Sequence, residues 1–245
     1  AGGGTWGTAA STHNVGIGNY VMDAAMNQST GNTAIGHQAL SGITTGDLNV
    51  IIGKDAGLVF NADETVIIGT QAGDALTSGA RNTVLGTYAL GTATTALYNT
   101  ALGYAAMDGV KAGIAVDGCV AIGQESLKGN SSNTTAISGT VAIGKEALLS
   151  LTTGAGNVAI GQNAADALTT GQKNVVIGYT ALSAGTGNSY NIAIGYEAML
   201  VANGADDSVC IGYQAGKAIS TGDYNILVGT GAGIKLTTGT RNIAV

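Results

Sequence analysis

An Ile-Gly dipeptide, or a close variant, recurs along this chain at a nearly constant interval. The residue before each recurring glycine is always aliphatic, and the residue three before it is always β-branched. Residues i and i+2 share one face of a β-strand, so the two columns predict a short strand in every repeat. The thirteen anchor glycines are Gly18, Gly36, Gly53, Gly69, Gly86, Gly103, Gly123, Gly144, Gly161, Gly178, Gly195, Gly212 and Gly229.

The interval between anchors indicates the fold class. Successive anchors are 18, 17, 16, 17, 17, 20 and 21 residues apart, and the last five intervals are all 17. Helix-pair repeats need over thirty residues, whereas 17 residues suit one coil of a β-solenoid with parallel strands about 4.8 Å apart. We therefore expect an all-β solenoid of about fourteen coils, a single segment over residues 1–245 with irregular longer coils at 104–144.

The column two before each anchor, between the two aliphatic columns, is also apolar in every repeat. We expect the flanking columns to face the core and this middle column to face outward, so the strand would be buried on both faces. A second layer within the coil could cover it. A self-association face is the preferred interpretation, because small apolar residues let identical chains approach closely. The interface candidates are Ala34, Ile51, Ile67, Val84, Ala159, Val176 and Ala193.

Other columns are typical of turns. The position four before the anchor is Asn in ten of fourteen repeats, and stacked Asn side chains can form amide ladders. Three after the anchor, Ala fills eleven of thirteen positions, which indicates tight packing.

Composition narrows the functional classes. Charged residues make up 10% of the chain, aromatics 4%, and the net charge of −6 is scattered, which disfavours a nucleic-acid partner. The apolar runs are too short for a membrane span, and no signal peptide is visible. Because the chain opens without Met and stops where a glycine is due, we expect it to be a window of a longer polypeptide.

Residues with catalytic or metal-binding chemistry are few. His13 and His37 are the only histidines and lack ligand-spaced partners, so no metal or cofactor is expected. Acidic residues recur two after the anchor, where an outward polar column explains them without catalysis, so we expect no enzyme. Cys119 and Cys210 are five coils apart, too far for a disulfide in a solenoid, and are expected to be buried apolar residues.

Two features are candidate recognition sites. Tyr179, Tyr196 and Tyr213 share the column one after the anchor, which predicts an outward aromatic ladder that is either structural stacking or a platform for glycan or protein contacts. The longer coils place their extra residues within 108–118 and 128–139, so Asn130 and Asn133 are surface candidates on the second insertion.

The repeat N-x-[AV]-I-G-x-x-A, as in NTAIGHQA, NVAIGQNA and NIAIGYEA, resembles the YadA-like head repeat of trimeric autotransporter adhesins. Similar arrays with longer coils occur in tailed-phage tail-fibre proteins and phage-like bacterial surface fibres. The resemblance covers essentially the whole chain and implies a left-handed parallel β-roll assembled as a homotrimer. The 17-residue period, against about fourteen in the adhesin head, favours the phage-fibre branch.

From this resemblance we expect a structural and adhesive segment of an extracellular trimeric fibre, on a phage tail or a bacterial surface. It would attach to a glycan or protein of a host or target cell, with no nucleic acid and no membrane insertion by this segment. An ice-binding β-solenoid is one alternative, but the paired Thr residues fall in turns rather than on a flat face. The other is the shaft of a glycan-degrading tailspike, whose catalysis would need a carboxylate pair in a cleft.

Overall fold

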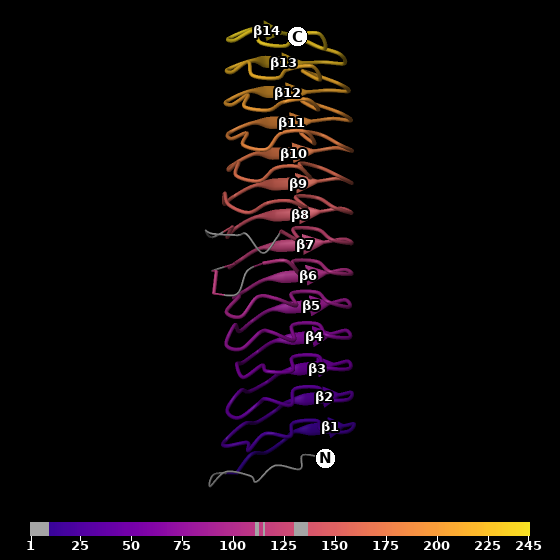
Figure 1. Ribbon diagram of the computed structural model, residues 1–245, viewed down its shortest axis with the longest axis vertical. Helices are drawn as coiled ribbons and strands as arrows, with labels where there is room; N and C mark the ends of the chain where they lie inside the picture. The colour runs from indigo at the N-terminus through magenta and orange to yellow at the C-terminus, as the bar shows by residue number, and fades with distance from the viewer. Residues whose placement is uncertain (1–9, 111–112, 115, 130–136) are drawn as a thin grey trace. The chain divides into compact units, whose positions relative to one another are not determined.

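The computed structural model describes residues 10–110, 113–114, 116–129 and 137–245. These residues contain fourteen short strands and no helix, and the chain divides into two compact units, residues 1–119 and 120–245. An all-β parallel solenoid of about thirteen turns is thereby confirmed, with its strands stacked in sequence order within each unit (Figure 1).

The first unit holds six parallel strands in register, each paired with the next along the chain. Its strands are β1 (Val15–Ile17), β2 (Thr33–Ile35), β3 (Val50–Ile52), β4 (Val66–Ile68), β5 (Thr83–Leu85) and β6 (Thr100–Leu102).

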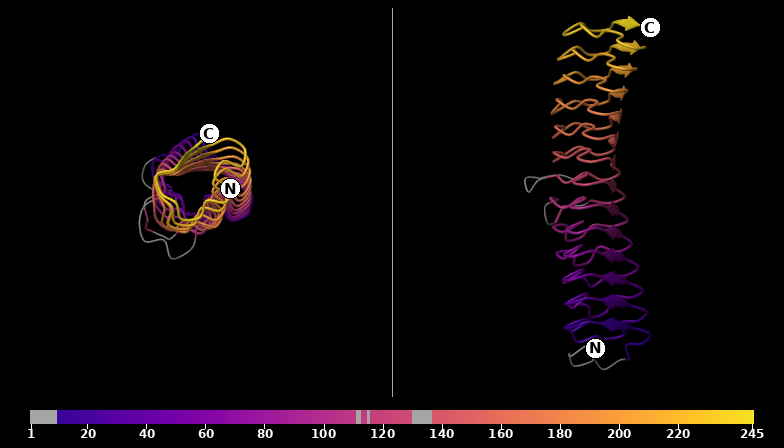
Figure 2. Two further views of the ribbon diagram at one scale, coloured as in Figure 1. Left: turned by 90° about the horizontal axis from the view of Figure 1, so that it is seen from above. Right: turned by 90° about the vertical axis from the view of Figure 1, so that its right-hand side faces the viewer.

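The second unit repeats the arrangement with eight strands. They are β7 (Val120–Ile122), β8 (Val141–Ile143), β9 (Val158–Ile160), β10 (Val175–Ile177), β11 (Ile192–Ile194), β12 (Val209–Ile211), β13 (Ile226–Val228) and β14 (Ile243–Ala244). Seen from above, the coils of each unit overlie one another (Figure 2).

The bends of each coil are also bonded to the next coil. In the second unit, for example, Leu182 N–H donates to Ala198 O at 2.9 Å and Thr169 N–H donates to Thr186 O at 2.8 Å. The bends use left-handed backbone at non-glycine residues such as Leu182 (φ 49°). That conformation costs about 1–2 kcal/mol per residue, which the coil-to-coil hydrogen bonds help to offset.

The strand faces are opposite to the sequence expectation. The middle residue of every complete strand from β2 to β13 is at most 1% exposed, and the flanking residues are half-buried or exposed. The middle residue therefore lies inside the coil, as do buried bend residues such as Leu168 and Leu182. Expecting the flanking residues inside was wrong, because bulky side chains from the bends also occupy the narrow interior and leave room for only one residue of each strand.

The predicted interface residues must be corrected accordingly. Each of the seven is buried within its own chain, so none offers surface to a second copy. They are Ala34, Ile51, Ile67, Val84, Ala159, Val176 and Ala193.

The predicted asparagine ladder is confirmed. In the second unit Asn174 Nδ2 donates to Asn157 Oδ1 at 2.9 Å, and Asn191 N–H donates to Asn174 Oδ1 at 3.0 Å. Asn174 Nδ2 also donates to the Asn188 carbonyl at 2.7 Å. The buried amides thus bond one coil to the next and tie the start of each strand to the bend that precedes the strand of the next coil.

Candidate functional site

The outward face of the strands is apolar along each unit. In the second unit all fifteen outward strand positions, from Val120 and Ile122 to Val228 and Ile243, are aliphatic. In the first unit nine of twelve are aliphatic and the others are Thr33, Thr83 and Thr100. No charged side chain interrupts either face. Contiguous exposed apolar surface of this kind marks an interaction site more often than a free surface.

The predicted tyrosine ladder is present and points outward. The rings of Tyr179 and Tyr196 stack with centroids 5.5 Å apart and an interplanar angle of 12°, and those of Tyr196 and Tyr213 with 5.3 Å and 9°. Each ring is between 43% and 51% exposed. Both faces of Tyr196 are covered by its neighbours, so the ladder offers ring edges and hydroxyls rather than a flat stacking surface.

A carboxylate lies beside the ladder. Glu197 Oε2 accepts hydrogen bonds from Gln214 Nε2 at 2.8 Å and from Lys217 Nζ. The hydrogen bond from Lys217, with that from Gln214, lowers the pKa of Glu197, and the negative charge of Glu197 raises the pKa of Tyr196. Tyr196 therefore keeps its hydroxyl proton at neutral pH.

Buried residues lie within or beside both insertions. Val110 and Val116 lie in the first insertion, Leu127 precedes the second and Ile137 lies in it, and all four are fully buried. The candidates Asn130 and Asn133 lie outside the described residues.

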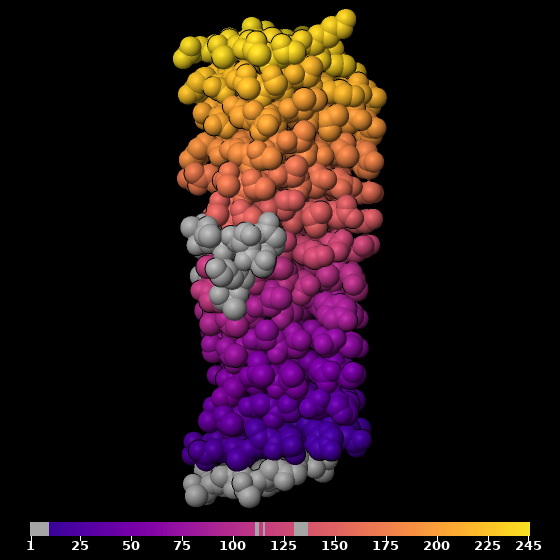
Figure 3. Space-filling view, in the orientation of Figure 1, coloured from indigo at the N-terminus to yellow at the C-terminus, as the bar shows by residue number. Residues whose placement is uncertain are grey.

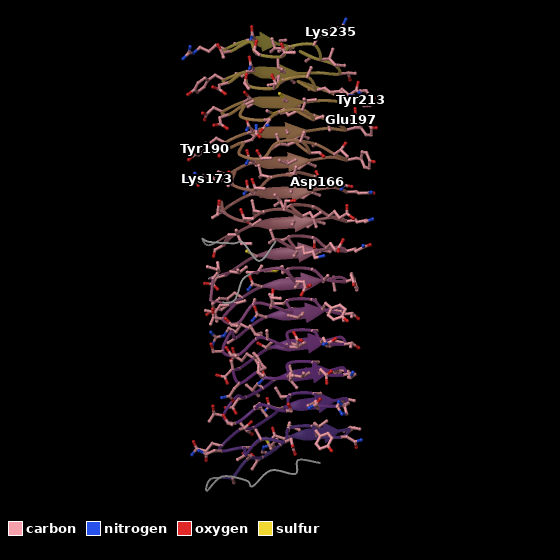
Figure 4. The ribbon with its side chains drawn as sticks, in the orientation of Figure 1. Asp166, Lys173, Tyr190, Glu197, Tyr213 and Lys235 are labelled. Carbon is pink, nitrogen blue, oxygen red and sulfur yellow. The ribbon has the colours of Figure 1, made fainter. Side chains whose placement is uncertain are left out.

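A second exposed column lies five residues before the anchor glycines and was not among the sequence predictions. In the second unit its consecutive members are Lys173, Tyr190, Asp207, Tyr224 and Arg241, here called the basic–aromatic column. Figure 4 shows Lys173 and Tyr190 at one edge of this unit and Tyr213 and Glu197 at the opposite edge. The sequence signal that could have revealed this column is the 17-residue spacing of its members, which equals the spacing of the tyrosine ladder.

The first unit carries a shorter version of this column. Arg81 Cζ lies 5.6 Å from the ring centroid of Tyr98, and Arg81 Nη1 donates to the Tyr98 hydroxyl at 2.9 Å. Arg81 Nε also pairs with Glu64. Leu48 precedes Glu64 in the same column and is 60% exposed, so the position accepts charged, aromatic and aliphatic side chains alike.

Two carboxylates of the second unit share an amide partner. Asn163 Nδ2 donates both to Glu146 Oε2 at 3.0 Å and to Asp166 Oδ2 at 3.1 Å, and Asp166 is labelled in Figure 4. The hydrogen bond from Asn163, followed by that from Lys145, lowers the pKa of Glu146. Glu146 is thus ionised at neutral pH, whereas a catalytic general acid needs a raised pKa.

The pKa of one carboxyl group, that of Asp74, is raised rather than lowered. Burial raises the pKa of Asp74, while the backbone N–H groups of Ala75 and of Asp74 itself oppose that shift. A carboxylate that accepts adjacent backbone N–H groups stabilises the bend in which it lies.

The histidines and cysteines do not assemble into a centre. His13 is exposed, and His37 Nδ1 lies 3.4 Å from Asp55 Oδ1. No group of three potential metal ligands occurs within the described ranges. Both thiols are buried, as expected, and burial raises the pKa of Cys210 to about 12.

Side chains cover the visible surface of each unit (Figure 3). In the part of the chain that the structure describes, no helix has the length and apolar character to cross a membrane. Comparisons with protein-family models, with curated proteins and with solved structures found no match to this chain.

Proposed function

We propose that this chain is a structural and adhesive segment of an extracellular fibre, on a phage tail or a bacterial surface, in which three copies associate and attach to a target cell. The observation that carries the proposal is the uncharged, mostly aliphatic outward face of the strands. A repetitive scaffold with such a face suits lateral assembly, and the number three comes from the resemblance of the repeat to trimeric fibre proteins.

The residues now proposed for the interface lie on this outward face. Val175 and Ile177 flank the buried Val176 of β10 and are half-buried in the single chain. Burying such side chains between copies removes apolar surface from water at about 25 cal/mol per Å². The same pair of outward positions recurs on each complete strand, so the stabilisation accumulates along the face.

Native mass spectrometry of the chain tests the assembly. The expected mass is close to three times the chain mass of 23.9 kDa. Ile177→Asp places a charge on the apolar face and is expected to shift the population toward monomer without unfolding the coil. The matched control Gln162→Asp lies on an exposed column outside the face and should leave the mass unchanged. A folded monomer of the unaltered chain would sink the trimeric assembly.

Attachment would use the surface columns without covalent chemistry, and three copies would strengthen weak contacts through avidity. The tyrosine ladder is the proposed contact for a glycan or protein of the target cell, through its hydroxyls and ring edges. Tyr196→Ala removes the central ring and is expected to weaken binding on a glycan array or to whole target cells at least about fivefold. Binding that is equal for both chains would remove the ladder as a contact.

A further inference from the structure

The basic–aromatic column of the second unit holds its five side chains in equivalent positions. All five residues have left-handed backbone, with φ between 53° and 60°, so their side chains leave the coil in the same direction. Backbone bonds join the coils at this column: Asp207 N–H donates to Ser189 O, and Tyr224 N–H donates to Asp206 O, both at 3.2 Å. The side chains therefore stand at the coil spacing of about 4.8 Å.

The two basic side chains lie on the outer sides of the two aromatic rings. Lys173 Nζ lies over the Tyr190 ring, 5.4 Å from its centroid, and Arg241 Cζ lies over the Tyr224 ring at the same distance. Lys173 comes one coil before Tyr190, and Arg241 one coil after Tyr224. The remaining face of each ring is thus directed toward the coil of Asp207, which lies between them.

The spacing between the two rings suits one cation. Two coil steps separate Tyr190 from Tyr224 by about 10 Å, so a group midway between the rings is about 5 Å from each. A cation interacts favourably with an aromatic face within about 6 Å of the ring centroid. Both tyrosines are about half exposed, at 47% and 52%, so a ligand can reach them from solvent.

The charges at this point favour a positive ligand. Asp207 is exposed, and its carboxylate makes no hydrogen bond or ion pair with any residue that the structure describes. A carboxylate beside two ring faces is unfavourable by itself, because the face of an aromatic ring is electronegative. Asp206 and Asp223, which bond backbone N–H groups in the adjacent column, add negative charge.

We propose that Tyr190, Asp207 and Tyr224 form a binding site for a quaternary ammonium group of the choline type. The two rings contact the methyl groups from opposite sides, and Asp207 neutralises the charge. A primary ammonium suits the site less well, because it is strongly hydrated and needs several hydrogen-bond acceptors. This site goes beyond the proposed fibre function and does not depend on it, because all its residues belong to one unit of one chain.

Saturation-transfer NMR with choline tests the site on the full chain, by following the N-methyl signal during titration. The expected dissociation constant is on the order of 1 mM. Tyr190→Leu and Tyr224→Leu should each weaken binding about tenfold, and Asp207→Asn about threefold. Leucine is tolerated in this column, because Leu48 adopts the same backbone with φ of 59°.

Three controls make the result specific. Tyr98→Leu removes a ring of the same column that also has a basic partner but has no second tyrosine two coils away, and binding should not change. The neutral isostere 3,3-dimethylbutan-1-ol should give little signal. Nα-acetyl-lysine amide should bind more weakly than choline. No detectable choline binding, equal binding by the isostere, tighter binding of the lysine derivative or insensitivity to both tyrosine variants would each overturn the site.

Discussion

Gly178→Ala is expected to lower the free energy of unfolding of the second unit by about 3–6 kcal/mol. Gly178 has φ of 141°, and a Cβ atom there would lie 2.2 Å from the carbonyl oxygen of Gly195 in the next coil. The alanine would have to adopt a strained backbone and also push two hydrogen-bonded coils apart. Chemical denaturation followed by circular dichroism measures the loss.

The matched control is Gly187→Ala in the bend that follows. A Cβ atom at Gly187 meets only the Thr170 hydroxyl oxygen, at 3.4 Å, and its φ is outside the left-handed range. This variant should differ from the unaltered chain by less than about 1 kcal/mol. Equal denaturation midpoints for the two variants would contradict the view that close coil contact requires the anchor glycines.

Asn174→Ala is expected to cost about 3–5 kcal/mol, because it interrupts the buried amide ladder. The change removes the acceptor of the Asn191 N–H and the donor to the Asn188 carbonyl, so two buried backbone groups lose partners. Thermal and denaturant unfolding of the second unit measure the effect.

Asn174→Ser tests whether the side-chain hydrogen-bond acceptor is what stabilises the ladder. Ser208 occupies the same column naturally, and its Oγ accepts the Asn225 N–H at 3.1 Å, so a hydroxyl can replace the amide oxygen toward the following coil. Serine at position 174 should therefore cost about half as much as alanine. If serine and alanine destabilise the chain equally, the side-chain acceptor is not what stabilises the ladder.

Much of the fold could be predicted from the sequence, because every coil repeats nearly the same pattern of apolar, asparagine and glycine positions. The position of each strand follows from the aliphatic and β-branched columns, and the Asn ladder and the outward tyrosines were predicted correctly. The facing of the strands was not, since both faces of each strand are apolar and the alternation does not show which one points inward. The bends supply bulky core residues, such as Phe60 and Met199, so the middle column packs inside and the flanking columns point outward.

The candidate sites were predicted less completely. The tyrosine ladder can be recognised in the sequence because the same residue type recurs in three successive coils. The column of Lys173, Tyr190 and Asp207 has a different residue type in every coil, so it is not recognised in this way. The residues of this column share a left-handed backbone conformation. Lysine, tyrosine and aspartate have no common sequence preference that would predict it. The handedness of the coil and the number of associated chains remain predictions.

The constant 17-residue repeat of the second unit would allow whole coils to be added or removed. From β8 to β14 every coil adds 17 residues and bonds only to its immediate neighbours. Gain or loss of one whole coil would keep the anchor glycines and the ladder positions in register, leaving the new junction equivalent to the old ones. Genetic duplication could thus alter the number of surface side chains in each column while leaving their spacing fixed.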